Sequence, residues 1–173
     1  MVHLRHLTKH MDIPVIYPPN PINPSFATSH RIFLGGSIEM GTATEWQGAF
    51  MTSLNERMRG SGDFVFYNPR RKDWDATWIQ EFTNPQFFQQ VTWELDALDA
   101  ATHIVLFFEP GTKSPISLLE LGLHARLSNV IVCVVCPDGF WRKGNVDIVC
   151  NKYGLLQFNT LEEAQEFIYN SIS

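Results

Sequence analysis

The sequence has little that would tie the protein to a membrane or to a nucleic acid. Its longest apolar runs, around HIVLFF and NVIVCVVC, are far shorter than the roughly 20 residues that cross a bilayer. No N-terminal segment combines basic residues, an apolar run and a small-residue cleavage site. The net charge is −5 at pH 7, and no basic run would follow a phosphate backbone. We therefore expect a soluble cytoplasmic protein that binds neither nucleic acid nor membrane.

Cysteine is also scarce, and the three cysteines do not predict a metal site. Cys133 and Cys136 form a CxxC pair, but the pair lies inside an apolar, β-branched segment. Zinc would need a second pair of ligands at a suitable spacing, and Cys150 alone does not supply it. We expect reduced, buried cysteines, and the sequence implies no metal or organic cofactor.

Several well-known catalytic signatures are absent. The stretch GGSIEMG (35–41) matches neither the G-x-G-x-x-G dinucleotide pattern nor the P-loop lysine pattern. Its glycines could expose backbone N–H groups to an anion, but Glu39 would repel a phosphate. A close backbone approach to an uncharged ligand fits this stretch better, and a plain tight turn fits it equally well. No Ser-His-Asp arrangement is legible, because His124 follows Glu120 by a full helical turn.

The composition is that of an ordinary globular protein, with 45% hydrophobic, 13% aromatic and 18% charged residues. A chain of 173 residues fits one domain. Five of the ten prolines lie between residues 11 and 30, where they exclude a helix or a central strand. We therefore expect residues 1–30 to be a proline-rich arm that runs over the surface, and residues 31–173 to be a single domain.

Apolar runs and helical periodicity alternate along this domain. Expected strands cover residues 31–36, 64–69, 103–108, 129–136 and 154–158. Expected helices cover residues 44–59, 85–101, the leucine-rich segment 114–127 and 161–172, with a short turn or helix near 146–151. Because the inner strands are apolar throughout, the pattern predicts a parallel sheet covered on both faces. The expected fold is α/β, a three-layer α/β/α arrangement of flavodoxin-like or Rossmann-like type with a five-stranded parallel sheet.

In such folds ligands bind beyond the carboxyl ends of the strands. Four loops should therefore gather at one edge of the sheet and line one cleft. They are GGSIEMG, NPRRKDWD, EPGTKSP and CPDGFWRKGNVD.

The segment SPISLLELGLHARL places one acid, Glu120, among five leucines. Glutamate is rarely buried without compensation of its charge. Pro115 suits the first turn of a helix, and Ser117 and Glu120, three residues apart, then share a face near its positive end. Gly122 is expected to let this helix pack closely on the sheet. Such a carboxylate could act as a nucleophile or a base, or it could be a solvated residue whose stem covers a leucine.

A second set of acids lies in WELDALDAA, where either Glu94 or Asp96 should point toward the strand ends. In the loop after the second strand, Asp73 and Asp75 flank Trp74. This arrangement could stack on and hydrogen-bond a planar base, or it could pin a long loop. Asn145 and Asp147 lie in a stretch that we interpret as a polar loop, where turn formation is an alternative role. Paired carboxylates are the groups that glycosyl transfer with retention uses.

Taken together, RIFLGGSIEMG, NPRRKDWD, WELDAL and SPISLLELG resemble the nucleoside 2-deoxyribosyltransferases and their relatives, over residues 31 to 160. The resemblance implies a flavodoxin-like or Rossmann-like fold. It also implies ping-pong transfer of 2-deoxyribose between nucleobases through a covalent glutamyl intermediate, with a nucleoside and a free base as substrates.

By this resemblance Glu120 matches the nucleophile, and Glu94 falls where many members have an assisting aspartate. Asn145 and Asp147 match a loop that in the family often reaches into a neighbouring subunit's site to hold the sugar 5′ end. The active unit would then be a homo-oligomer, a dimer or larger, with sites at subunit interfaces. The expected substrate-binding residues are Phe33, Gly35, Ser37, Asp73, Asp75, Ser117, Asn145 and Asp147.

A related branch of the family hydrolyses deoxynucleoside 5′-monophosphates, and its first loop typically carries an arginine after Gly-Ser-Ile. Here that place is Glu39, which favours an uncharged nucleoside over a phosphorylated one. Four cations could reverse this preference: Arg70, Arg71, Lys113 and Arg142. Hydrolysis of nucleosides or nucleotides, and nucleoside sensing without catalysis, are therefore the alternatives to transfer.

Overall fold

A computed structural model of the chain describes residues 13–22, 30–38, 43–58 and 63–173. The strands are β1 (Val15–Ile16), β2 (His30–Gly36), β3 (Phe64–Tyr67), β4 (His103–Phe107), β5 (Ile131–Val135) and β6 (Leu156–Phe158). The helices are α1 (Gln47–Arg57), α2 (Pro85–Ala100), α3 (Pro115–His124), α4 (Lys143–Tyr153) and α5 (Leu161–Ile172). The strands form one parallel sheet in the order β1-β3-β2-β4-β5-β6.

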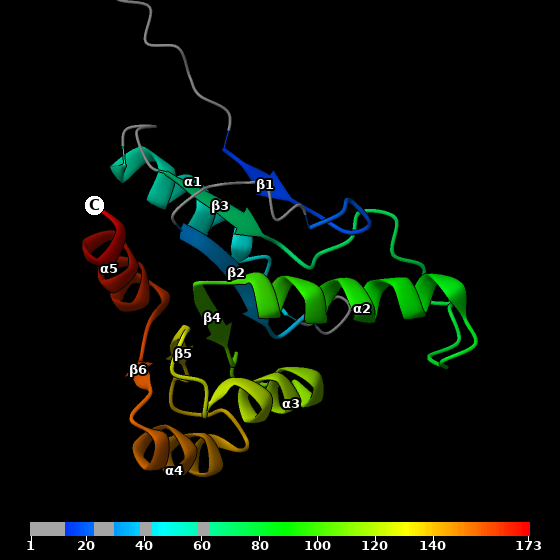
Figure 1. The fold of residues 1–173 in the computed structure, drawn as a ribbon. Coiled ribbons are helices and arrows are strands. Elements are labelled where there is room, and N and C mark those ends of the chain that lie inside the picture. Colours follow the sequence, from blue (N-terminus) through cyan, green and yellow to red (C-terminus); the bar gives the residue numbers. More distant parts are fainter. Residues whose placement is uncertain (1–12, 23–29, 39–42, 59–62) are drawn as a thin grey trace, which may run out of the picture.

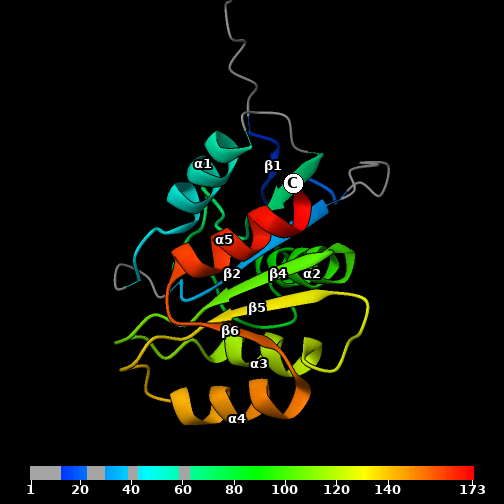
Figure 2. The same ribbon diagram turned by 90° about the vertical axis from the view of Figure 1, so that its left-hand side faces the viewer.

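The helices cover both faces of this sheet, as the apolar character of the inner strands predicted. α2, α3 and α4 pack on one face and bury Trp93, Leu121 and Val146. α1 and α5 pack on the other face and bury Leu54 and Ile168. Figure 1 shows α1 and α5 to the left of the sheet and α2 and α3 to its right, and Figure 2 shows the same layers from the side. The three-layer α/β/α expectation is confirmed.

The expected number of five strands is wrong, because the described part of the chain forms six. The additional strand, β1, lies in the proline-rich segment and pairs with β3 at the edge of the sheet. The β3–β1 contact includes hydrogen bonds from Phe66 N to Pro14 O and from Asn68 N to Ile16 O. Proline is tolerated at the end of an edge strand, where its missing N–H is not needed. The domain boundary at residue 31 stays a prediction, although residues 15 and 16 join the sheet.

The region near residue 146 is more helical than expected. α4 begins at Lys143 and ends at Gly154, whose left-handed φ of 66° suits a glycine at a helix end. Asn145 and Asp147 therefore lie in the first turns of a helix, and their expected place in a polar loop is wrong. None of the helices in the described ranges is long and apolar enough to cross a membrane.

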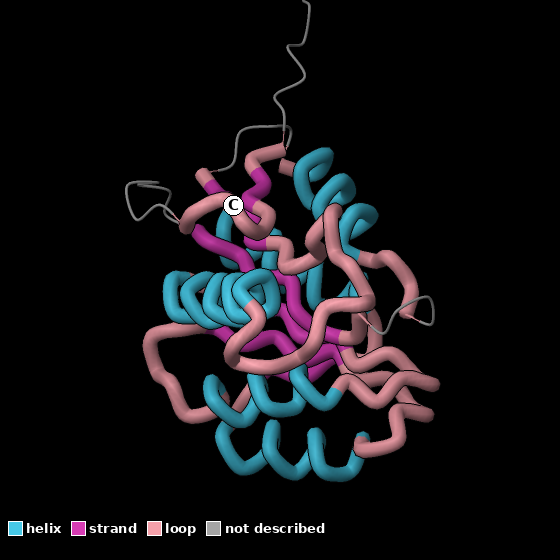
Figure 3. Tube along the Cα trace, turned by 90° about the vertical axis from the view of Figure 1, so that its right-hand side faces the viewer, coloured by secondary structure: helices cyan, strands magenta, loops and turns pink. Residues whose placement is uncertain are grey.

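The parallel strands direct their following loops to one edge of the sheet, and Figure 3 shows the gathered loops at this edge. α2 starts beyond the loop after β3, at Asn84, whose Oδ1 accepts hydrogen bonds from the N–H groups of Gln86 and Phe87. α3 starts after the loop that follows β4, at Ser114 and Pro115. These two helices carry the acids Glu94 and Glu120.

Candidate active site

The end of β2 is pressed against β4, and two glycines make this possible. A Cβ atom on Gly36 would lie 2.3 Å from the carbonyl oxygen of Phe107, and the φ of Gly36 is 137°, which only glycine adopts readily. A Cβ atom on Gly35 would lie 2.6 Å from the ring of Phe33. Phe33 itself is fully buried in the core. The expected substrate contacts of Phe33 and Gly35 therefore gain no support, because both residues serve the packing of β2.

Next to these glycines, a cluster of three buried hydroxyl groups joins β2 to the start of α3. The Ser37 Oγ atom lies 2.6 Å from Thr112 Oγ1 and also bonds Ser114 Oγ, and Thr112 Oγ1 lies 3.0 Å from Ser114 Oγ. Ser37 also receives a hydrogen bond from the N–H of Glu109, and its own N–H donates to Phe107 O. Ser114 has a left-handed φ of 47°, so the cluster fixes the turn from which α3 starts.

Glu120 lies one turn along α3 from Ser117, and both residues are buried, as their spacing on one face predicted. The Glu120 residue is only 7% exposed. Burial raises the pKa of Glu120 to about 8, and the nearby Glu94 carboxyl contributes in the same direction. The structure therefore does not support the interpretation of Glu120 as a solvated residue.

Glu94 faces inward from α2, whereas Asp96 is exposed, so one of the two acids points in as expected. Burial raises the pKa of Glu94 to about 7, and a hydrogen bond from the Gln90 side chain opposes this shift. Gln90 Nε2 lies 2.8 Å from Glu94 Oε1 and 2.9 Å from Pro69 O.

Two nearby carboxyl groups that the fold largely removes from water hold on to a proton near neutral pH. Between their first and second ionisations, the pair carries one proton and one negative charge. One member can then attack or stabilise a developing positive charge, while the other gives or takes a proton. This is the chemical capacity of the Glu94–Glu120 pair.

The two acids of the loop after β3 are engaged within the loop. Asp73 accepts hydrogen bonds of 2.8 and 3.2 Å from the Arg71 guanidinium, which holds the pKa of its carboxyl below the usual value. Asp75 accepts from the N–H and the hydroxyl of Thr77 at 2.8 and 2.7 Å. The ring of Trp74 meets that of Trp78 edge to face at 5.1 Å. These contacts favour the loop-pinning interpretation, and recognition of a base by either acid stays a prediction.

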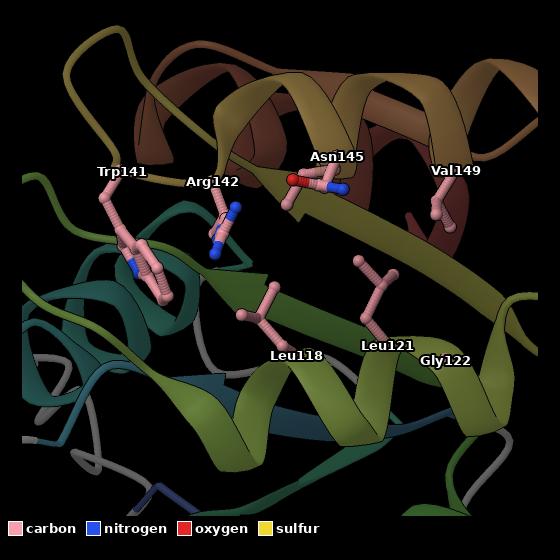
Figure 4. Close-up of a pocket in the computed structure, with 8 residues that line it drawn as sticks. Leu118, Leu121, Gly122, Trp141, Arg142, Asn145 and Val149 are labelled. Carbon is pink, nitrogen blue, oxygen red and sulfur yellow. The ribbon is translucent and has the colours of Figure 1, made fainter.

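The residues expected at the sugar 5′ end lie on α4. Asp147 accepts from Lys143 Nζ at 2.9 and 3.0 Å and also from Gln157 Nε2. Asn145 lines a groove of about 330 Å³ between α3 and α4, where α3 contributes apolar side chains (Figure 4). The lining residues are Leu118, Leu121, Gly122, Trp141, Arg142, Asn145, Val146 and Val149. Glu120 does not line this groove, and the expected role of Asn145 and Asp147 at a neighbouring subunit's site stays a prediction.

The leucines around Glu120 divide into two sets. Leu121 is 3% exposed, whereas Leu119, Leu123 and Leu127 are 59%, 51% and 45% exposed. Gly122 is exposed, and a Cβ atom on it would meet no atom within 4 Å, so the expectation that it permits close packing on the sheet is wrong.

All four cations considered for a phosphate interact with other groups of the protein. Arg70 donates to Gln47 Oε1 and to Thr44 O, and Arg71 is held by Asp73. The Arg142 guanidinium lies 4.3 Å from the centre of the Trp141 ring. Glu39, which bears on the same question, lies outside the described residues.

The cysteines are free and buried, as expected. Within the described ranges no group of three or more His, Cys, Asp or Glu residues could hold a metal ion.

The sequence-based expectations missed Gln90, Thr112 and Ser114. The spacing of Gln90, four residues before Glu94 on an expected helix, could have identified it as a partner of that acid. Thr112 and Ser114 belong to a loop whose course depends on the contact between β2 and β4, and no local pattern predicts this course.

The chain was compared with known proteins in three ways. A solved structure with a similar fold is described as a conserved protein from Enterococcus faecalis V583; it has a TM-score of 0.59 and 10% sequence identity, and the match covers 83% of this chain and 99% of that one. At this identity the likeness shows the fold alone. No curated protein sequence gives a significant match. The sequence model of a family described as nucleoside 2-deoxyribosyltransferase like matches residues 29–140, more than half of the chain. With this match, and with the inward-facing Glu94 and Glu120 on its fold, the chain belongs to the nucleoside 2-deoxyribosyltransferase-like family.

Proposed function

We propose that the protein transfers 2-deoxyribose between nucleobases, with retention at the anomeric carbon and without a cofactor. The observation that carries this proposal is the pair formed by the buried Glu120 and the half-buried Glu94, in which each carboxyl group has a raised pKa. Membership in a nucleoside 2-deoxyribosyltransferase-like family supports a nucleoside as the substrate.

In the first half of the reaction, the ionised Glu120 carboxylate attacks C1′ of a 2′-deoxynucleoside. A bond forms between a Glu120 oxygen and C1′, the bond from C1′ to the base nitrogen breaks, and the base leaves with a proton. In the second half, a nitrogen of another base attacks C1′ on the face that the first base left, and Glu120 is released as a carboxylate. Two inversions at C1′ give net retention.

Glu94 handles the proton in this scheme. The departing base nitrogen needs a proton, and a carboxyl pair that holds one proton near neutral pH can supply it through Glu94 and recover it from the incoming base. The hydroxyl cluster of Ser37, Thr112 and Ser114 lies at the start of the helix that carries Glu120, where it holds the helix in place. In this proposal Ser117 and Ser37 remain the substrate-binding candidates next to the nucleophile.

We further propose that the active unit is a homo-oligomer. An exposed apolar stripe is formed by Ile116, Leu119 and Leu123 of α3 together with Leu127, which follows the helix, and it is called here the α3 stripe. An apolar stripe of this kind supports burial against a second protein surface. Ile116 and Leu123 are four and three residues from Glu120, so a second copy on this stripe would also shield the nucleophile from water.

The test is base exchange. Each of the four common 2′-deoxynucleosides is incubated with a different free base, and the products are separated by liquid chromatography. Wild-type protein should form the exchanged nucleoside, and Glu120→Gln should lower the rate by about 10³-fold or more because the nucleophile is lost. Asp99→Asn changes an exposed acid of α2 and should retain the wild-type rate.

Two other results of this assay would indicate a different function. Release of free base from a deoxynucleoside or its 5′-monophosphate, without exchange, would indicate an N-glycosidase in which water replaces the second base. Tight nucleoside binding without turnover, unchanged in Glu120→Gln, would indicate a sensor.

A further inference from the structure

Gln90 is a polar residue on the inner face of α2, and it is only 4% exposed. It lies one helical turn before Glu94. Its Nε2 atom donates to Glu94 Oε1 at 2.8 Å and to Pro69 O at 2.9 Å. Because only Asn68 separates Pro69 from β3, this amide ties the carboxyl group of the helix to the end of the strand.

The surroundings fix the orientation of the amide. Pro69 O can only accept a hydrogen bond, so a flipped amide would place two carbonyl oxygens against each other. With Nε2 turned toward Pro69 and Glu94, the Gln90 Oε1 atom is buried and has no hydrogen-bond partner among the described residues. The fold therefore leaves one acceptor unpaired and uses both N–H groups.

We infer that Gln90 is a positioning residue that holds Oε1 of Glu94 toward the end of β3 and leaves Oε2 of Glu94 for the substrate. This inference rests on the proposed function, in which Glu94 transfers the proton of the base. Without Gln90, a carboxyl group on a flexible side chain could turn to several rotamers, and proton transfer requires one defined geometry.

A purely structural role does not account for this residue. Trp93 and Ala97, the neighbours of Gln90 on the inner face of α2, are both buried and apolar. An apolar residue at position 90 would avoid the unpaired acceptor, but it would leave Pro69 O and Glu94 Oε1 without this donor. The amide is thus explained by the two groups to which it donates and not by packing.

The charges around Glu94 are few. The titratable group near Glu94 is Glu120 of the neighbouring helix α3, and the Glu94 carboxyl helps to raise the pKa of Glu120. In the loop after β3, Arg70 is engaged by Gln47 and Thr44, and Arg71 is engaged by Asp73. Gln90 is therefore the residue whose replacement should change the Glu94 titration.

The experiment follows the Glu94 carboxyl carbon by ¹³C NMR as a function of pH, in the wild type, in Gln90→Met and in Gln90→Lys. An N–H donor favours the ionised carboxylate, so Gln90→Met should raise the apparent pKa of Glu94, by about one pH unit. Gln90→Lys offers a charged donor and should lower it. The limb of the kcat profile for base exchange that reports Glu94 should move in the same direction in each variant, and kcat of Gln90→Met should fall about tenfold, with KM nearly unchanged.

Gln86→Met, an exposed change on the same helix, is the control and should alter neither the Glu94 titration nor kcat. Melting temperatures show that each variant is folded. An unchanged Glu94 titration in folded Gln90→Met overturns the inference. The NMR titration needs no turnover, so a wild-type protein that exchanges no base contradicts the proposed function and leaves the hold of Gln90 on Glu94 to be judged by the titration alone.

Discussion

At the scale of single residues, the carboxyl pair shows a conflict between stability and chemistry. An acid whose pKa is raised by burial is easier to ionise in the unfolded chain than in the folded one. Its ionisation therefore favours unfolding. Glu94 and Glu120 both have this property, with pKa values raised to about 7 and about 8. A fold that keeps two such groups lowers its own stability, which is typical of groups retained for function.

The first prediction concerns the stability of Glu120→Gln. Between the unfolded pKa of about 4.5 and the folded pKa of about 8, the folded state binds more protons, so the wild-type free energy of unfolding falls as pH rises. Glutamine carries no charge, so the variant should exceed the wild type by ~2–4 kcal/mol at pH 9 and by much less at pH 5. Urea unfolding at both pH values measures this. A difference that is the same at both pH values would contradict it, and Asp99→Asn is the control.

The second prediction concerns the pH dependence of turnover. The reactive form of the pair carries one proton, which is lost above the second ionisation, and its carboxylate is lost below the first. The profile of kcat/KM should therefore be bell-shaped, with its limbs near the values of about 7 and about 8. Initial rates of base exchange between pH 5 and pH 10 measure it. A profile that stays flat from pH 5 to pH 7 would show that Glu94 and Glu120 do not titrate in the rate-limiting step.

At the scale of elements, the sequence predicted the regular parts well and the local exceptions poorly. Strands β2, β4 and β5 are long apolar runs, and α2 and α5 have clear starts at Asn84 and Thr160, so period and capping identify them. β1 has only two residues and no period. α4 has Arg142 at its N-cap position and no side-chain cap, so the sequence of this polar stretch carries no signal for the start of a helix.

The difference between local spacing and tertiary contacts also explains which site residues the sequence could predict. The spacing of Ser117 and Glu120 on a helix is a local property, and the structure preserves it. Whether Asp73 is open to a ligand depends on Arg71, whose side chain is only 6% exposed, and burial of that kind is a tertiary property. The role of Gly36 likewise depends on Phe107, a residue of another strand.

The third prediction contrasts two glycines that the sequence alone did not distinguish. Gly36→Ala places a Cβ atom 2.3 Å from a backbone oxygen at a φ of 137°, so it should lower the free energy of unfolding by about 2 kcal/mol or more. Gly122→Ala fills open space in an exposed helix position and should raise the free energy of unfolding by ~0.5–1 kcal/mol. Urea unfolding compares them, and an equal effect in both variants would refute the assignment.

The fourth prediction concerns the α3 stripe. Leu119→Lys and Leu123→Lys place charges on this stripe, and together they should reduce the mass of the assembly to that of one chain of 19.8 kDa. Ile79→Lys, at an exposed apolar position of the loop after β3, should leave the mass unchanged. Light scattering after size-exclusion chromatography measures the mass. A wild-type protein that is already a monomer would reject the proposed oligomer.

At the scale of the whole molecule, the two ends of the sheet respond to pH in opposite ways. His103 stands at the amino end of β4, where its ring nitrogens contact Thr102 Oγ1 at 2.9 Å and Ser171 Oγ of α5 at 3.4 Å. Burial lowers the pKa of His103 to about 4, and His30 adds to this effect. The carboxyl pair at the opposite edge destabilises the fold as pH rises, and His103 destabilises it as pH falls. Their combination places maximum stability between the two effects, at mildly acidic pH.

The fifth prediction tests the His103 contribution. Between the unfolded pKa of about 6.5 and the folded pKa of about 4, the unfolded state binds more protons, so the free energy of unfolding falls as pH drops through this window. The His103 contribution to this loss should be ~2–3 kcal/mol, and His103→Gln, which cannot take up the proton, should lack it. Urea unfolding at pH 4.5, 5.5 and 6.5 gives the slopes, and identical slopes for the two proteins would show that His103 does not govern acid unfolding. Glu120→Gln should change the slope in the opposite sense, over the window from the unfolded pKa of about 4.5 to the folded pKa of about 8. The two variants together therefore separate the amino edge of the sheet, which sets acid stability, from the carboxyl edge, where the proposed chemistry lowers stability at neutral and alkaline pH.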